Sequence, residues 1–597
     1  MQGGGVASGA TTFNWQSQAG GNLADGANWD QGGAIPGSAN DDTIRIQSNQ
    51  SAPITLSQDI TLVSGTANYL GFNGEMKFDT AETTLSMKQS YWRASSRVWS
   101  FTRGILNLGA FYFENGNDNA ISGNTLTISG SEATLKGGVT MASTSPNNTM
   151  IITNGAKAVL TGFCVGRNAD NYGKDKDLVS SNNLFRVTGA GTTASVSGVV
   201  STGVRANNRV EVLDGATADF LEVKLGISSY DSSDTTVTHV FDPGGTLLVS
   251  GAGTKLTVNP NGTYNKSNAK RLVVGWSTGS NTLEVVNGAE LVCLSNYVDV
   301  GNSLYKSDQK TGNEYKALGT IDITNRVPTY RFPGNVLRVK GAGSKFVFRG
   351  TASSGVRVAW NNGCTDDNRI EVLDGASWDS DGGDFAVYGA SSNGVYVGKG
   401  ATFTHGGYAI HIGNQTESTD AFFTVDGGAC TSTVDFAIGP AGARSRLEVL
   451  NGGRLVADGA GFLIGGKRDT TEERAAVFSI SGASSSASAK TLALYSDSTL
   501  AFDVPETGFD ATPLKVQTVT FGTLCAKRPT LRVTASAKNR ARYVTLVEAE
   551  NAIALPDGLT LDLPEGASLV KEGSSRYDAK KITVKLPTAL GFMIIVR

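Results

Sequence analysis

A ten-residue phrase that recurs along the middle of the chain constrains the fold more than any other feature. It is clearest at 368–377, where alternating apolar and polar residues end at Asp374-Gly375. Further versions occupy 208–217, 281–290 and 445–454. Period-two alternation is typical of a strand with one buried face, and Asp-Gly or Asn-Gly is typical of a tight turn. The phrase therefore predicts a strand and a corner, with Ile370 and Val372 pointing inward.

The turn glycines repeat at a nearly constant minimum spacing. They are Gly130, Gly155, Gly189, Gly215, Gly251, Gly288, Gly341, Gly375, Gly400, Gly427, Gly452 and Gly482. The shortest interval is 25 residues, for instance from Gly375 to Gly400. That length suits one coil of a β-solenoid, which needs three short strands and their turns. About twelve coils spaced about 4.8 Å apart would form a rod of about 60 Å.

The predicted fold is all-β: a right-handed parallel β-helix (β-solenoid) with N- and C-terminal β caps. We expect an N-terminal cap and first coils over 1–120, solenoid repeats over 121–489, and a C-terminal cap or small β domain over 490–597. An apolar run ending in Gly, such as 436–439, marks a second corner in each coil. Polar insertions follow that corner at 167–181, 227–244, 302–333 and 466–474. In-register coils would place these loops along one edge, where they either recognise a partner or are merely tolerated.

The two ends of the chain differ from its middle. Phe13-Asn14-Trp15, Asn28-Trp29, a Pro-Gly turn and paired acids precede a strand, and the two tryptophans are expected to cover the open end of the core. This opening resembles bacterial autotransporter-like (passenger-type) surface proteins, which implies an extracellular or cell-surface location. The resemblance does not extend to the C-terminus, where the strand series of a membrane barrel is missing. The apolar ending 591–597 is expected to form a final strand, whose apolar character would also allow it to pair with another copy.

Composition excludes several classes of function. The 597 residues carry a formal net charge of −3 and no long Lys/Arg cluster, so a nucleic-acid partner is not expected. No apolar run of about 18 residues is present, so no membrane-spanning helix is expected. The opening Met1-Gln2-Gly3 lacks the pattern of a signal peptide. The five cysteines are scattered without zinc-site spacing, and we expect them to be small buried residues.

Residues that could carry chemistry are few. The histidines are His239, His405 and His411, and none belongs to a zinc-protease pattern. The acidic run at 379–384 starts like a calcium loop but has Ala390 where the bidentate Glu is required, which leaves only a looser site at Asp379, Asp381 and Asp384. Candidate acids for a glycan-cleaving enzyme are Asp299, Asp366, Asp367 and Asp435. Glu211, Glu284, Glu371 and Glu448 recur at one coil position and predict an exposed ladder. We therefore assign no catalytic, cofactor-binding or metal-binding residue and expect no cofactor.

An aromatic and basic run at 91–103 allows two interpretations. Tyr and Trp beside Arg could form a stacking platform for sugars or bases. Strand periodicity favours the other interpretation, in which Trp99 and Phe101 enter the core while the arginines point outward.

Two hypotheses about function follow. The preferred one is a secreted or cell-surface structural and adhesive β-solenoid, not an enzyme, acting through its rod surface, edge loops and end-to-end self-assembly. Its expected partners are further copies of itself, surface glycans or another cell-surface protein. The alternative is a carbohydrate-active parallel β-helix enzyme, a polysaccharide lyase or glycoside hydrolase, which needs a single non-repeated cluster of acids, basic residues and aromatics.

Overall fold

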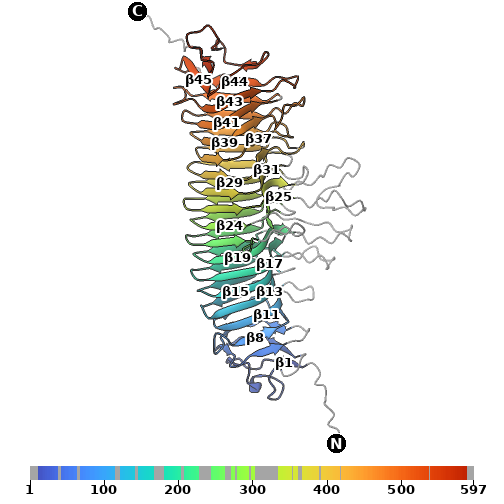
Figure 1. Cartoon of the computed structure of the whole chain (residues 1–597). Coiled ribbons are helices and arrows are strands. Elements are labelled where there is room, and N and C mark those ends of the chain that lie inside the picture. Colours follow the sequence, from blue (N-terminus) through green and yellow to red (C-terminus); the bar gives the residue numbers. More distant parts are fainter. Residues whose placement is uncertain are drawn as a thin grey trace, which may run out of the picture. The chain divides into compact units, whose positions relative to one another are not determined.

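The computed structural model describes residues 11–37, 42–62, 68–113, 121–141, 145–166, 180–203, 207–227, 244–262, 271–275, 279–294, 297–302, 334–351, 354–360, 366–388, 391–416, 418–495, 497–536 and 538–587. The described residues up to Leu294 belong to one compact unit, unit 1, and those from Tyr297 onward belong to unit 2. Each unit is built from parallel strands stacked coil upon coil (Figure 1). The predicted parallel β-helix is confirmed. The predicted insertions at 167–181, 227–244 and 302–333 lie mostly outside the described residues, and the ending 591–597 lies wholly outside them.

Unit 1 contains two sheets. The strands of its first sheet are β2 (Gly21–Asn22), β4 (Ile54–Thr55), β7 (Gly74–Met76), β10 (Val98–Phe101), β12 (Thr125–Ser129), β14 (Thr149–Thr153), β16 (Leu184–Thr188), β18 (Arg209–Leu213), β20 (Thr246–Ser250) and β23 (Thr282–Val286). Those of its second sheet are β1 (Thr12–Asn14), β3 (Thr43–Ile46), β5 (Ile60–Leu62), β6 (Asn68–Leu70), β8 (Thr84–Met87), β9 (Gln89–Tyr91), β11 (Gly104–Tyr112), β13 (Ala133–Met141), β15 (Lys157–Val165), β17 (Thr193–Gly203), β19 (Thr217–Ile227), β21 (Lys255–Val258), β22 (Arg271–Val274) and β24 (Glu290–Leu294). A short 3-10 helix, η1, spans Gly26–Asn28.

Unit 2 repeats this arrangement. Its first sheet contains β26 (Val336–Lys340), β29 (Arg369–Leu373), β32 (Gly394–Val397), β35 (Phe422–Asp426), β38 (Arg446–Leu450), β40 (Val477–Ser481), β42 (Thr499–Val504), β44 (Thr530–Ala535) and β46 (Thr560–Asp562). Its second sheet contains β25 (Tyr297–Asn302), β27 (Lys345–Arg349), β28 (Gly355–Trp360), β30 (Ser377–Asp381), β31 (Asp384–Val387), β33 (Thr402–His405), β34 (Ile410–Ile412), β36 (Ala429–Ser432), β37 (Phe436–Ile438), β39 (Arg454–Ile464), β41 (Ser486–Leu494), β43 (Leu514–Phe521), β45 (Tyr543–Ala549), β47 (Ser568–Leu569) and β48 (Lys581–Lys585).

One coil consists of a first-sheet strand followed by two short second-sheet strands, as in β29, β30 and β31. Ile370 and Val372 are fully buried while Arg369 is exposed, so the predicted facing of this phrase is confirmed. Equivalent core positions stack on one another from coil to coil. Trp378 lies between Phe346 and Phe403 of the adjacent coils, with ring centroids 4.2 and 5.7 Å away and the rings nearly parallel. Such aromatic pairs add about 0.5–1.5 kcal/mol beyond the burial of their area.

The predicted corner at Asp374-Gly375 is a tight turn of the type I′ kind. Both central residues have positive φ, 54° and 80°, and the backbone N–H of Ala376 donates to the carbonyl of Leu373 at 3.1 Å. Asp and Asn tolerate the left-handed region better than most residues, and Gly enters it freely. The same turn closes the phrase at Asp214-Gly215, which explains why this dipeptide recurs.

A buried ladder of asparagines precedes the first-sheet strands. In unit 1 the backbone N–H of Asn148 donates to Oδ1 of Asn183 at 3.0 Å, and that of Asn183 donates to Oδ1 of Asn208 at 3.2 Å. In unit 2 the N–H groups of Asn335 and Asn368 donate likewise to Asn368 and Asn393, at 3.2 and 2.9 Å. These side chains are at most 1% exposed. Each amide therefore satisfies a buried donor of the neighbouring coil, which water cannot reach.

Neighbouring coils of unit 1 alternate between two kinds of turn. The turn at Asn154-Gly155 is followed one coil later by a turn that starts at Gly189 and ends in Thr192. The hydroxyl of Thr192 accepts the N–H of Gly155 at 2.9 Å. The next pair of coils repeats the contact, because Thr254 accepts the N–H of Gly215 at 2.8 Å. The period of this part of the structure is thus two coils.

The two described ends are closed differently. At the start of unit 1, Trp15 and Trp29 are buried and pack edge to face with centroids 5.0 Å apart, as the sequence predicted for a cap. In unit 2 the parallel pairing continues through β44 and β46, while β45 and β47 pair with β48 in antiparallel fashion. Of the helices in the described ranges, none has the length and apolar character that crossing a membrane requires.

The asparagine ladder leads to a stability prediction. Replacement of Asn368 by Leu removes the Oδ1 that accepts both the backbone N–H and Nδ2 of Asn335. Leaving a buried donor unsatisfied costs about 1–3 kcal/mol, so hydrogen exchange should accelerate for amides of β26, β29 and β32. Exchange followed by mass spectrometry measures this effect. The exposed neighbour provides the control, since Arg369→Ala should leave protection unchanged, and equal effects of both substitutions would contradict the ladder's role.

Candidate functional site

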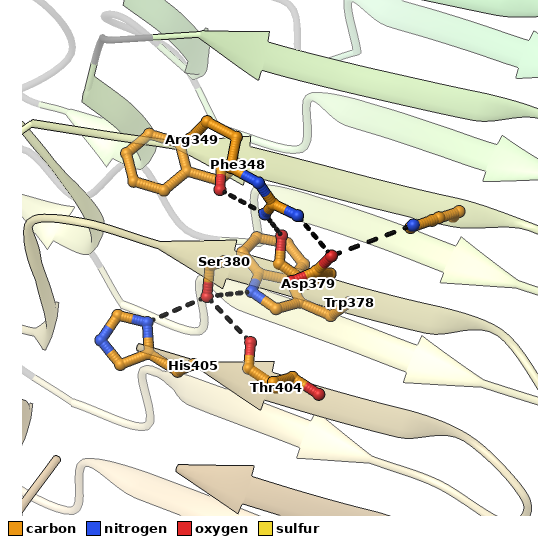
Figure 2. Close-up of polar contacts among 8 residues, drawn as sticks. Phe348, Arg349, Trp378, Asp379, Ser380, Thr404 and His405 are labelled. Carbon is orange, nitrogen blue, oxygen red and sulfur yellow. Dashed lines mark hydrogen bonds and ion pairs between the residues drawn. The ribbon is translucent and has the colours of Figure 1, made fainter. Parts of the chain in front are cut away.

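His405, the more deeply buried of the two described histidines, belongs to a chain of buried hydrogen bonds (Figure 2). Nε1 of Trp378 donates to Oγ of Ser380 at 2.9 Å, and Ser380 lies 2.9 Å from Nδ1 of His405. Nε2 of His405 donates to the carbonyl of Tyr408 at 3.2 Å. Since Nε2 carries the proton, Nδ1 can only accept, and the single hydroxyl proton of Ser380 is shared between Nδ1 and the carbonyl of Thr404, which lies 3.1 Å away.

The pair of Ser380 and His405 has a structural role rather than a role in nucleophilic catalysis. Ser380 and His405 are each 1% exposed, so a substrate cannot reach either. Burial lowers the pKa of His405 from 6.5 to about 4, against smaller opposing effects of the Tyr408 carbonyl and Asp381. The imidazole is therefore neutral near pH 7 and serves as a polar link between coils.

The acidic run at 379–384 does not form the loose calcium site that the sequence left open. Asp379 is paired with Arg349 at 2.6 Å and lies 3.9 Å from Lys345, on the outer side of the same coils (Figure 2). Arg349 thus takes the position where a cation would sit beside Asp379. Within the described ranges, no group of three or more His, Cys, Asp or Glu side chains is arranged to hold a metal ion.

A polar face on the second sheet of unit 2 brings together side chains from four consecutive coils. Asp299 of β25 pairs in register with Arg357 of β28, and the guanidinium holds both carboxylate oxygens at 2.6 and 2.9 Å. Arg357 also lies 3.9 Å over the ring of Tyr297. The next coils carry Asp384 on β31 and His411 on β34. We refer to Asp299, Arg357, Asp384 and His411 as the polar face.

His411 differs from His405 in its surroundings. It is 7% exposed, and neither ring nitrogen has a hydrogen-bond partner among the described residues. Burial, assisted by the positive charge of Lys467, lowers its pKa from 6.5 to about 4, while Asp384 opposes the shift. His239 lies outside the described residues.

The other candidate acids are not brought together. Asp366 accepts the N–H of Ser391 at 2.9 Å, and Asp435 accepts that of Gly461 at 2.7 Å, so each carboxylate holds the backbone of a neighbouring coil. Asp367 lies 3.8 Å from Arg369.

The expected exposed glutamate ladder is wrong at its first member. Glu211 is 2% exposed because Arg186 and Arg209 cover it, each at 2.7 Å. Glu371 is similarly paired with Arg338 at 2.7 Å, so each unit contains an arginine–glutamate pair that joins two neighbouring coils at this position. This repetition identifies the position as part of the scaffold.

A tyrosine column lies on the outer side of unit 1. Tyr69 of β6, Tyr91 of β9 and Tyr112 of β11 pair in register on consecutive coils. The rings of Tyr91 and Tyr112 stack at 5.2 Å and 21°, while those of Tyr69 and Tyr91 are 6.4 Å apart and tilted. Cζ of Arg93 lies 3.8 Å from the ring centroid of Tyr69, and that of Arg45 lies 5.1 Å from it. We call these five residues the tyrosine–arginine cluster.

The cluster combines a predicted part with a part that sequence reasoning missed. Trp99 and Phe101 are buried, as strand periodicity predicted, whereas Tyr91 and Arg93 point outward. The sequence did not point to Tyr69 and Tyr112, because both lie outside the aromatic and basic run at 91–103. A signal was present, since Tyr69 precedes Tyr91 by 22 residues and Tyr112 follows it by 21, close to one coil.

The lowered pKa values of His405 and His411 predict that unit 2 becomes less stable at acidic pH. Because both folded-state pKa values lie near 4, below the usual 6.5, the unfolded chain takes up protons first as the pH falls. Burying the neutral rings costs no stability above about pH 6.5, whereas below that pH the unfolding free energy falls, by about 3 kcal/mol at pH 4 for the fully buried His405.

Urea unfolding at pH 7 and pH 4.5 measures this loss. The substitution His411→Leu removes one buried group that must stay neutral, so the variant should lose less stability on acidification than the unchanged chain does. If the unfolding free energy falls by the same amount between pH 7 and pH 4.5 in His411→Leu and in the unchanged chain, the assignment of this titration to His411 is contradicted.

Comparison of the chain with protein-family models, with curated proteins and with solved structures finds no significant match. The β-solenoid assignment therefore rests on the strand pairing and burial of the two units. The conclusions about function rest on the polar face and the tyrosine–arginine cluster.

Proposed function

We propose that this protein is a structural and adhesive β-solenoid that acts at the bacterial cell surface or outside the cell and binds surface glycans through its outer face. The tyrosine–arginine cluster carries this proposal. Aromatic rings and guanidinium groups are the side chains that stack against sugar rings and bind their polar groups. Here they stand on successive coils whose backbone is fixed by parallel pairing, so the binding surface is preorganised.

The use of repeated polar residues supports a scaffold role. The ion pairs Arg186–Glu211 and Arg338–Glu371 each join two adjacent coils, at 2.7 Å. Partly buried pairs of this geometry hold the register of neighbouring strands. Such positions stiffen each unit.

The resemblance of residues 13–46 to autotransporter-like surface proteins supports the proposed location. We further propose self-association as a means of assembly. In unit 2, β46 pairs with β44, and its Leu561 is 40% exposed. A second copy that adds a strand to this terminal coil would bury that side chain.

A second candidate function is a carbohydrate-active β-helix enzyme, favoured by the polar face of unit 2. Asp299, Arg357, Asp384 and His411 are single-copy residues on consecutive coils, as catalysis requires. Against this, both carboxylate oxygens of Asp299 are held by the buried Arg357. The neutral His411 and the exposed Asp384 would then have to supply the acid and the base.

One pair of assays separates the two functions. We expect the protein to bind members of an immobilised panel of neutral and acidic glycans while releasing no reducing ends and no unsaturated products from them. Turnover that Asp384→Asn abolishes, with binding retained, would establish the enzyme and overturn the adhesive proposal. Neither binding nor turnover across the panel would contradict both.

A further inference from the structure

We propose that the tyrosine–arginine cluster recognises an acidic sugar residue within a glycan, of the uronic acid class. The inference rests on the proposed function, because it names the ligand class of the surface that carries it. Three features of the cluster lead to this class: two uncompensated guanidinium groups, one open aromatic face, and a floor of small side chains beside that face.

The first feature is positive charge without a partner. Among the described residues, neither Arg45 nor Arg93 has a carboxylate within ion-pair distance. Some arginines on the outer faces are paired with acids, as Arg349 is with Asp379 and Arg444 with Asp420. Both free guanidinium groups are directed over the ring of Tyr69, which restrains them in one place. A planar carboxylate is the anion that a restrained guanidinium fork fits best.

The second feature is the orientation of the tyrosine rings. The ring of Tyr91 is covered on one side by Tyr112, with which it stacks at 5.2 Å. Tyr112 ends the column, because the residue paired with it on the next coil is Thr140. One face of the Tyr112 ring is therefore directed toward small side chains, and it offers a flat apolar surface to the ring of a sugar.

The third feature is the small size of the side chains that follow Tyr112 in the column. The positions that continue the column are Thr140 and then Cys164, both half-buried and both much smaller than tyrosine. Gly138 and Gly162 stand beside them in the same register. A sugar stacked on Tyr112 would lie on this low floor. Arg93 follows β9 and Tyr112 belongs to β11, so the two residues lie on adjacent coils, about 5 Å apart along the stack, which a short oligosaccharide spans.

These features favour an acidic glycan over a nucleic acid. Single-stranded nucleic acids are bound by several separate aromatic platforms within a strongly basic groove. Here the rings are stacked on one another, and the whole chain carries a net charge of −3. Two arginines suit one or two carboxylates rather than a long phosphate chain.

The test uses the full chain and trigalacturonate as the probe, with its fully methyl-esterified form as the uncharged match. Isothermal titration calorimetry should show binding of the acid at least tenfold tighter than binding of the ester, and weaker binding at higher salt. Arg93→Gln and Tyr112→Ala should each reduce affinity for the acid about tenfold or more. Arg97→Gln is the matched control, because Arg97 lies outside the cluster and donates to Asn49. It should leave affinity unchanged.

The outcomes distinguish this inference from the function it rests on. Equal binding of acid and ester, or equal effects of Arg93→Gln and Arg97→Gln, would overturn the acidic-sugar assignment while leaving glycan adhesion intact. Tighter binding of a thymidine decanucleotide than of trigalacturonate would also overturn it. Unchanged far-UV circular dichroism and thermal unfolding of the variants show that a lost affinity is not a lost fold.

Discussion

The constraint on which the structure depends is that each coil must match the next one residue for residue. Parallel pairing places equivalent positions of neighbouring coils in columns, and a side chain in a column meets its own counterpart about 4.8 Å away. Apolar columns tolerate this easily. A polar column needs a donor on one coil for each acceptor on the next, and a column of asparagines meets this need because the amide both donates and accepts. The ladder through Asn148, Asn183 and Asn208 therefore fixes the register at a place where water is excluded.

The same constraint separates scaffold residues from recognition residues. A side chain that recurs in a column is used by the neighbouring coil, as Glu211 is by Arg186. A side chain that breaks the column is available for other tasks. The tyrosine column of unit 1 ends at Tyr112, where Thr140 follows, and the polar face of unit 2 gathers single-copy groups around Arg357. On this solenoid the candidate functional residues lie where a column of like side chains ends.

The architecture could be predicted from sequence because its signals are local. The alternation around Ile370 and the dipeptide Asp374-Gly375 specify a strand and a turn without reference to distant residues. The partners of outward residues could not be predicted in this way. Glu211 is buried by arginines 25 and 2 residues away along the chain, and Tyr69 meets Arg93 across a coil boundary. Because insertions of variable length separate the coils, the sequence alone does not show which residues are paired across coils.

The alternation of turns in unit 1 has a consequence for how such a chain can change its length. Each turn that ends in threonine supplies a hydroxyl to the glycine N–H of the coil before it, as Thr192 does for Gly155 and Thr254 for Gly215. Gain or loss of a single coil would place two like turns together and leave one N–H without its acceptor. Gain or loss of two coils preserves this contact. In unit 1 the repeating structural element is thus a matched pair of coils.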